Sequence, residues 1–207
     1  MTYLFTERSD TLKMNKPTIQ GLAALSLIVV LAGGLQGCAV VAAGGAGAAV
    51  ATDRRSAGTM VDDQAIELKI NNALFKNDQL SRQAHINATS YGGVVLLTGE
   101  APSEALRDTA VELARHVDHV KRVHNEITIG APSSTKSRSK DTWTTTKVKT
   151  QLIATKEVSA NSVKVVTENG SVYLMGLLTR AEAEIATDVA RHIDNVTRVV
   201  TLFEYQD

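Results

Sequence analysis

Cysteine, proline and aromatic residues are all scarce in this chain of 207 residues. It has one cysteine, three prolines, one tryptophan, four tyrosines and three phenylalanines. A single cysteine excludes an internal disulfide framework, so a folded core must hold without one. The formal net charge is zero, with 22 basic and 22 acidic residues. Such a balance provides no global positive field, which argues against nucleic acid as a partner.

Catalytic motifs are also missing. The sequence contains no nucleophile elbow, phosphate loop or positioned catalytic dyad, and its Asp and Glu residues are scattered as on a solvated surface. We therefore expect neither enzymatic activity nor a cofactor.

An uncharged stretch dominates the N-terminal quarter. No charged residue occurs between Lys16 and Asp53, and an apolar segment from Gly21 to Leu35 follows Met14-Asn15-Lys16. One positive charge before such a segment is typical of a signal peptide that starts at Met14. Residues 1–13 are then an over-called start or an extension removed with the signal. The alternative is a transmembrane helix, which needs about 20 apolar residues, although glycines make this segment a poor helix.

The apolar segment ends at Leu35-Gln36-Gly37-Cys38, which holds the only cysteine. This stretch resembles the lipobox of bacterial lipoproteins, from which it departs at Gln36, where a small residue is commoner. The resemblance implies that residues 1–37 are a cleaved signal peptide and that Cys38 is diacylated. Because Ala39 stands where an Asp would retain a lipoprotein at the inner membrane, the resemblance also implies anchoring in the outer membrane, facing the periplasm. Cleavage removes three basic and two acidic residues, which leaves 19 basic and 20 acidic ones.

Residues 38–61 are predicted to be a lipidated, flexible tether. They are rich in Ala, Gly and Val, and a flexible chain of this length spans about 25–30 Å root-mean-square. A membrane-embedded hairpin formed by the Gly-Ala run is the alternative. The tether would hold the folded part close to the bilayer and leave it free to orient.

The remainder of the chain is an internal duplication. Gly93 and Gly99 of the first copy match Gly170 and Gly176 of the second, both 77 residues on, and His116 matches His192. Repeats at a fixed period indicate one structural unit used twice. We predict a first domain over residues 62–130, a polar linker over 131–140, and a second domain over 141–207.

Within each unit the hydrophobic period changes in a consistent order. In the first unit, helical spacing near Ile70 is followed by a short strand over residues 85–89 and a tight turn at Gly92-Gly93. A second strand, a helix that starts near Pro102 and a last strand over residues 123–129 complete the unit. The predicted fold is α+β with the order α-β-β-α-β. A right-handed crossover then gives a three-stranded mixed sheet with two helices on one face. The other face is left to solvent or to the sister unit.

This order and the two glycines resemble the BON domain, and both repeats match over residues 62–207. The whole chain is similar to outer-membrane lipoproteins that carry two BON domains. The stretches that support this are Asp141-Thr142-Trp143, Thr145-Thr146-Lys147-Val148 and Leu174-Met175-Gly176-Leu177. The resemblance implies a phospholipid-binding module whose second domain contacts lipid, with a role in outer-membrane integrity and enrichment at division sites.

The first helix of the second unit carries the candidate site. If Val148 and Leu152 face the core, Trp143 points about 140–180° away from them, and Lys147 lies about 40° from Trp143. Residues 136–149 hold five basic residues and one acidic residue. Tryptophan favours the headgroup region, and basic residues favour an anionic surface. We expect this face to contact anionic phospholipid (phosphatidylglycerol or cardiolipin) through Trp143, Thr146, Lys147, Lys149, Thr150 and Ile153.

The sequence leaves other roles open for Trp143. It could pack on the first repeat or cap its own helix, or it could mark a protein contact, since exposed aromatics do this too. Asp141 or Thr142 is expected to cap that helix. The first repeat has Ala65 where the second has Trp143, and its residues 62–130 hold 7 basic and 10 acidic residues. We therefore expect that it does not bind anionic lipid.

Three histidines of the first repeat, His116, His119 and His124, have a spacing that could serve a metal. Only His116 recurs in the second repeat, as His192, whereas Asn195 and Val200 replace the other two. A single histidine at a helix C-terminus is explained by the helix dipole. We therefore expect no metal site.

Three hypotheses for function follow, in order of preference. The first is a lipid-anchored periplasmic protein that docks on anionic phospholipid through its second domain. The second is an adaptor whose Trp143 face binds an outer-membrane assembly protein. The third is a periplasmic stress chaperone, as the likeness to other BON proteins implies.

Overall fold

The computed structural model describes residues 53–206. The expected signal peptide with its start at Met14, the transmembrane alternative, Cys38 and the tether up to residue 52 lie outside the described residues. Between residues 53 and 206, no helix is long and apolar enough to cross a bilayer.

Each repeat folds into the predicted order of elements, with one short addition. The first repeat contains α3 Ala57–Lys76, α4 Asp78–Gln83, β1 His85–Tyr91, β2 Val94–Ala101, α5 Glu104–Arg115 and β3 Arg122–Ile129. The second contains α6 Thr135–Ala154, the 3-10 turn η3 Ala160–Ser162, β4 Val163–Glu168, β5 Ser171–Leu178, α7 Arg180–Arg191 and β6 Arg198–Tyr205. The α+β class and the α-β-β-α-β order are confirmed. The short elements α4 and η3, which precede the first strand of each repeat, were not predicted.

Both sheets have the same mixed topology. In each, the central strand (β2 or β5) pairs antiparallel with the strand before it and parallel with the strand after the crossover helix. The second glycine of each repeat, Gly99 or Gly176, lies where the first strand of the sheet comes closest to the central strand. A Cβ on Gly99 would collide with the carbonyl oxygen of His85, and one on Gly176 would collide with that of Ser162. These glycines therefore permit the first two strands of each sheet to approach.

The first helix of each repeat begins earlier than the sequence predicted. Ser56 caps α3 by accepting a hydrogen bond from the Thr59 amide, and Ser134 caps α6 through the Ser137 amide. Residues 57–61 of the expected tether and 135–140 of the expected linker are therefore helical. The prediction that Asp141 or Thr142 caps this helix was wrong, because Ser134 already satisfies the free amides of the first turn.

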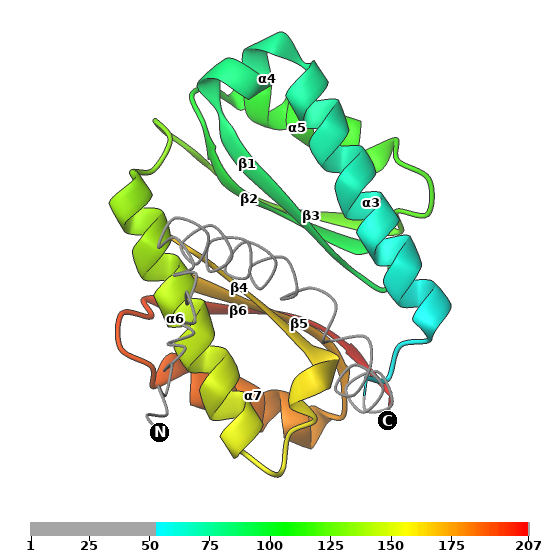
Figure 1. Cartoon of the computed structure of the whole chain (residues 1–207), viewed down its shortest axis with the longest axis vertical. Helices are drawn as coiled ribbons and strands as arrows, with labels where there is room; N and C mark the ends of the chain where they lie inside the picture. The colour runs from blue at the N-terminus through cyan, green and yellow to red at the C-terminus, as the bar shows by residue number, and fades with distance from the viewer. Residues whose placement is uncertain (1–52, 207) are drawn as a thin grey trace, which may run out of the picture. The chain divides into compact units, whose positions relative to one another are not determined.

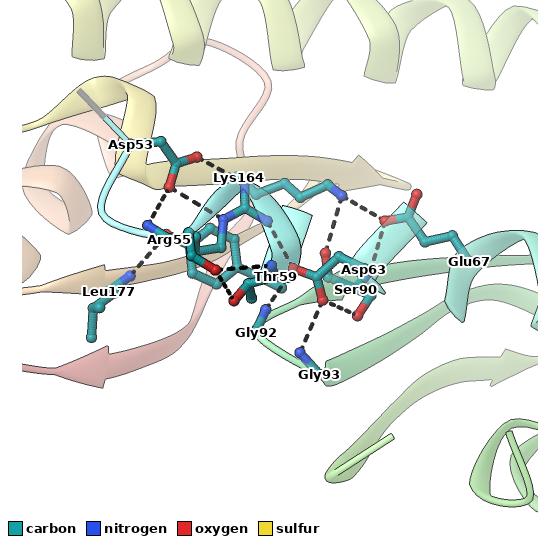
Figure 2. Close-up of polar contacts among 12 residues, drawn as sticks. Asp53, Arg55, Thr59, Asp63, Glu67, Ser90, Gly92, Gly93, Lys164 and Leu177 are labelled. Atoms are coloured by element: carbon teal, nitrogen blue, oxygen red, sulfur yellow. Dashed lines mark hydrogen bonds and ion pairs between the residues drawn. The ribbon is translucent and has the colours of Figure 1, made fainter. Parts of the chain in front are cut away.

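Asp141 instead has a structural task that recurs in the first repeat. Asp63, near the start of α3, accepts hydrogen bonds from the amides of Gly92 and Gly93 at 2.8 and 2.9 Å (Figure 2). Asp141 accepts hydrogen bonds from the amides of Asn169 and Gly170, both at 2.9 Å. Both carboxylates are buried. Each one fixes the hairpin turn of its repeat onto the first helix.

Alternate residues along the central strands face two different cores. Val95 and Leu97 face a core closed by α3 and α5, and the second repeat has a corresponding core under α6 and α7. The opposite sheet faces meet each other through a third apolar cluster that includes Leu96, Tyr173 and Met175. The folded part is thus four layers, helices, sheet, sheet, helices, with α3 and α5 on one outer side and α6 and α7 on the other (Figure 1). Of the two predicted environments for the second sheet face, the sister unit is the one observed.

Residues 53–55, which precede the N-cap Ser56 of α3, join the two repeats. The guanidinium of Arg54 makes a bidentate ion pair with Glu182 of α7, at 2.7 and 2.9 Å. Arg55 donates to Asp63 of α3 at 2.9 Å and lies 3.9 Å from the centroid of the Tyr91 ring. Residues 53–55, expected as the end of a flexible tether, are therefore held at the junction of the repeats.

Candidate membrane-contact face

The α6 helix has one buried side and one exposed side. Val148 and Leu152 are buried in the core of the second repeat, as predicted. Trp143 is 60% exposed and Ile153 is 71% exposed. The alternative in which Trp143 packs against the first repeat is therefore wrong. The helix presents its two large apolar side chains to solvent.

The polar residues predicted for this site lie on the exposed side of α6 or next to it. Thr146, Lys149 and Thr150 are exposed. Thr146 donates its hydroxyl hydrogen bond back to the Thr142 carbonyl, at 3.0 Å. Such a bond to the preceding turn satisfies the hydroxyl within the helix. The Thr146 hydroxyl is therefore already engaged within the helix.

Lys147 reaches towards the turn that follows α7. Its amine lies 3.5 Å from a carboxylate oxygen of Asp194, and its side chain is 33% exposed. An ion pair this open to water contributes little, about 0–1 kcal/mol, and a stronger anionic partner can displace it. Lys147 therefore lies on one flank of the exposed face and Lys149 on the other.

The exposed charges of α6 are all positive. The helix carries the basic residues Lys136, Arg138, Lys140, Lys147 and Lys149, and its only acidic residue is Asp141. Asp141 is buried and accepts hydrogen bonds from two backbone amides of the hairpin turn, so its carboxylate does not lie on the exposed side. The helix therefore presents a positive field around Trp143, although the chain as a whole is neutral.

Lys136 and Lys140 belong to this face and were not among the predicted site residues. They lie seven and three residues before Trp143, which places them on the same side of the helix. The sequence analysis counted their charges but placed both in a linker. The N-cap serine could have corrected this, because Ser134 lies 78 residues after Ser56, as Asp141 does after Asp63.

A groove of about 530 Å³ runs beside the exposed face. Its floor is β4, its walls include α6 and two residues at the start of β1, and its lining includes Thr142, Thr145, Thr146 and Lys149. Glu168 is also part of its lining. Burial raises the pKa of Glu168 to about 7, and the nearby charges of Glu100 and Asp141 add to this effect. At neutral pH this carboxyl is partly protonated, so the groove carries less negative charge than its residues suggest.

The corresponding helix of the first repeat differs in chemistry. In α3, Ala65 occupies the position of Trp143, and Val61, Leu68 and Phe75 are exposed. The charged residues of α3 are Asp62, Asp63, Glu67, Lys69 and Lys76. Lys69 pairs with Asp118, and Glu67 pairs with Lys164 of β4. The exposed side of α3 is thus apolar without a positive field.

The two repeated histidines have equivalent settings at helix ends. The Nδ1 atoms of His116 and His192 each lie 2.7 Å from the carbonyl oxygen four residues earlier, that of Glu112 or Asp188. A histidine that binds the last carbonyls of a helix caps its C-terminus. Within residues 53–206, no group of three or more His, Cys, Asp or Glu side chains is arranged to hold a metal.

Comparison with known proteins agrees with this architecture. The family model described as "BON domain" matches twice, at residues 62–131 and 140–207. The chain is 41% identical over 191 residues to the "Outer membrane lipoprotein DolP" of Haemophilus influenzae, covering 90% of this chain and 99% of that protein. It is 42% identical over 153 residues to the "21 kDa hemolysin" of Actinobacillus pleuropneumoniae, covering 74% of this chain and 79% of that one. It is also 31% identical over 157 residues to "Osmotically-inducible protein Y" of Escherichia coli, covering 74% and 78%.

Proposed function

The chain belongs to the BON-domain family and is a lipid-anchored outer-membrane protein, and from this premise we propose that α6 of the second domain docks on anionic phospholipid. Acyl chains on Cys38 would supply the stable attachment. Docking by α6 would then select where on the membrane the protein gathers and would support envelope integrity, with enrichment at division sites. This is the function of a binding module and not of an enzyme.

One observation carries the proposal: the exposed Trp143 lies on a helix whose exposed charges are all basic. An indole at the level of the headgroups and several amines beside it match the two features of an anionic bilayer surface. Each basic residue near such a surface contributes about 1 kcal/mol at low screening. Four of them (Lys136, Lys140, Lys147 and Lys149), partly screened, give a weak and reversible contact, whereas a pair of acyl chains gives a lasting one.

Liposome binding tests the proposal. The non-acylated chain from residue 39 onward is titrated with vesicles of neutral lipid, with and without phosphatidylglycerol or cardiolipin. We expect binding only when anionic lipid is present, and Trp143→Glu should weaken it by about tenfold, equivalent to about 1.4 kcal/mol. Ile129→Glu is the matched control, because it introduces the same charge at an exposed apolar position of the first repeat, outside both α6 and α3. Equal affinities for Trp143→Glu and the unaltered chain would contradict the proposal.

The adaptor hypothesis has one observation in its favour, since an exposed tryptophan next to a groove also suits a protein partner. A photo-crosslinker at position 143 in cells separates the two. Adducts to phospholipid support membrane docking, whereas one dominant adduct to an outer-membrane assembly protein supports the adaptor.

A further inference from the structure

An apolar stripe runs along the outer side of α3. Val61, Leu68 and Phe75 are 65%, 64% and 78% exposed, and they are spaced seven residues apart. Ile66, Ile70 and Leu74 face the core from the opposite side of the helix. A spacing of seven keeps side chains in one line along a helix and is the repeat by which two helices pack against each other. Exposed apolar side chains in such a line indicate an unfilled helix contact.

The stripe is complementary to itself when a second copy is turned end for end. Val61 lies seven residues before Leu68, and Phe75 lies seven residues after it. In an antiparallel pair centred on Leu68, each Phe75 therefore meets the partner's Val61, and the two Leu68 side chains meet at the two-fold axis. An isologous contact requires this kind of self-complementarity.

Charges at the two ends of the stripe obey the same symmetry. Asp62 and Lys76 lie on the same flank of α3, next to Val61 and Phe75 respectively. An antiparallel pair brings each Lys76 next to the Asp62 of the other copy on one flank, whereas a parallel pair would place these residues of the two copies on opposite flanks and leave them unpaired. Between them, Lys69 is already balanced by Asp118, 3.2 Å away.

A shallow depression of mixed polarity adjoins one end of the stripe. It has a volume of about 210 Å³ and is lined by the apolar Leu74, Phe75, Leu80, Ala84 and Ile86 and by the polar Asn71, Ser81 and His85. In the antiparallel arrangement Val61 of the other copy lies at the Phe75 end, next to this depression.

We propose that α3 is a contact between two copies of this chain, paired antiparallel about Leu68. The contact is independent of membrane docking, because α3 and α6 lie on opposite outer sides of the folded part (Figure 1). A single helix pair buries less than about 1,200 Å², which is typical of weak and transient association. A shared lipid anchorage concentrates the copies in one plane, so weak association is sufficient there.

Cysteine cross-linking tests both the contact and its direction. The chain from residue 39 onward contains no cysteine, so Val61→Cys, Leu68→Cys and Phe75→Cys each introduce a single thiol. With a short bismaleimide, Leu68→Cys should give a covalent dimer alone. Val61→Cys and Phe75→Cys should cross-link efficiently only when mixed, to give the heterodimer. Glu184→Cys on α7, in the other outer helical layer, serves as an exposed control.

The cross-linking results distinguish the antiparallel pair from a parallel pair and from the absence of a self-contact. Efficient dimers of Val61→Cys with itself and of Phe75→Cys with itself would indicate a parallel pair and overturn the proposal. No dimer at position 68 above the level of the Glu184→Cys control would overturn it too, whether or not another protein is captured there.

Sedimentation equilibrium gives a second and independent readout. The unaltered chain should dimerise at high concentration, and Leu68→Gln should raise the dissociation constant at least about tenfold. Asp62→Lys should weaken the dimer, and the double variant Asp62→Lys with Lys76→Asp should restore it. A monomer at all concentrations up to the millimolar range, on liposomes as in solution, contradicts the proposal.

Discussion

The two repeats share a scaffold and differ on the surface that each first helix presents. In α3 and α6 the equivalent positions Ile70 and Val148 are buried, and so are Asp63 and Asp141. The outward positions differ. The outer side of α6 carries Trp143 and several lysines, whereas α3 has Ala65 at the position of Trp143 and an exposed apolar stripe without an excess of basic residues. The duplicated fold therefore constrains one side of each helix and leaves the other free to acquire a separate partner.

The largest effect should come from the glycine that both repeats share at the strand crossing. Gly99→Val should destabilise the first repeat by about 3 kcal/mol or more, since a Cβ there has no space and strain adds to overpacking. Gly99 also has a φ of +112°, whereas the φ of Gly176 is not positive. Gly176→Val should therefore cost less than Gly99→Val. Thermal unfolding followed by circular dichroism measures both, and equal losses would show that the backbone angle contributes nothing.

The buried aspartates come next. Burial raises the pKa of Asp63, but hydrogen bonds from Ser90, Gly93, Gly92 and Arg55 outweigh it and hold the pKa below its usual value. Asp63→Ala should cost about 3 kcal/mol, because it removes the acceptor of two backbone amides, of the Ser90 hydroxyl and of one N–H of Arg55, which keeps only its pairing with Asp53. Asp141→Ala removes the acceptor of two amides only and should cost about 2 kcal/mol. Urea unfolding of the two variants tests this order, and a reversed order contradicts the role given to Arg55.

Much of this architecture could be predicted from the sequence, and the failures have two causes. The hairpin glycines and the alternating strands predict the fold because their constraints are local. The start of α6 was misplaced because Lys136, Arg138 and Lys140 suggest a solvated linker, while the cap that decides the boundary is a lone Ser134. The sequence likewise predicts an exposed Trp143 from the helical period. It could not reveal that Arg54 and Arg55 bind distant acids, because such contacts depend on how the repeats pack.

Two glutamates at the junction of the repeats should give the stability opposite responses to pH. The pKa of Glu168 is raised by burial to about 7, so its contribution to stability is complete below about pH 4.5 and is lost as the pH rises through 7. The pKa of Glu182 is lowered to about 2, chiefly by the hydrogen bond from Arg54. Its contribution is present above about pH 4.5 and is lost as the pH falls towards 2.

The midpoint of thermal unfolding between pH 3 and pH 9 measures both contributions. We expect a maximum near pH 5, with a decline on either side. Glu168→Gln should flatten the alkaline side and Glu182→Gln the acid side. If each variant leaves its own limb unchanged, other carboxyl groups control the pH dependence.

The smallest expected effect is also the sharpest test of what distinguishes the two helices. Ala65→Trp places an indole on α3 at the position equivalent to Trp143, and Ala65 is exposed, so the fold should tolerate it. We expect the binding of phosphatidylglycerol liposomes to change by less than about twofold, because α3 has no excess of basic residues and each amine near the surface contributes about 1 kcal/mol. Trp143→Ala in parallel should lose most of the binding. A large gain from Ala65→Trp would mean that the indole alone is sufficient and that the lysines of α6 have no part in lipid recognition.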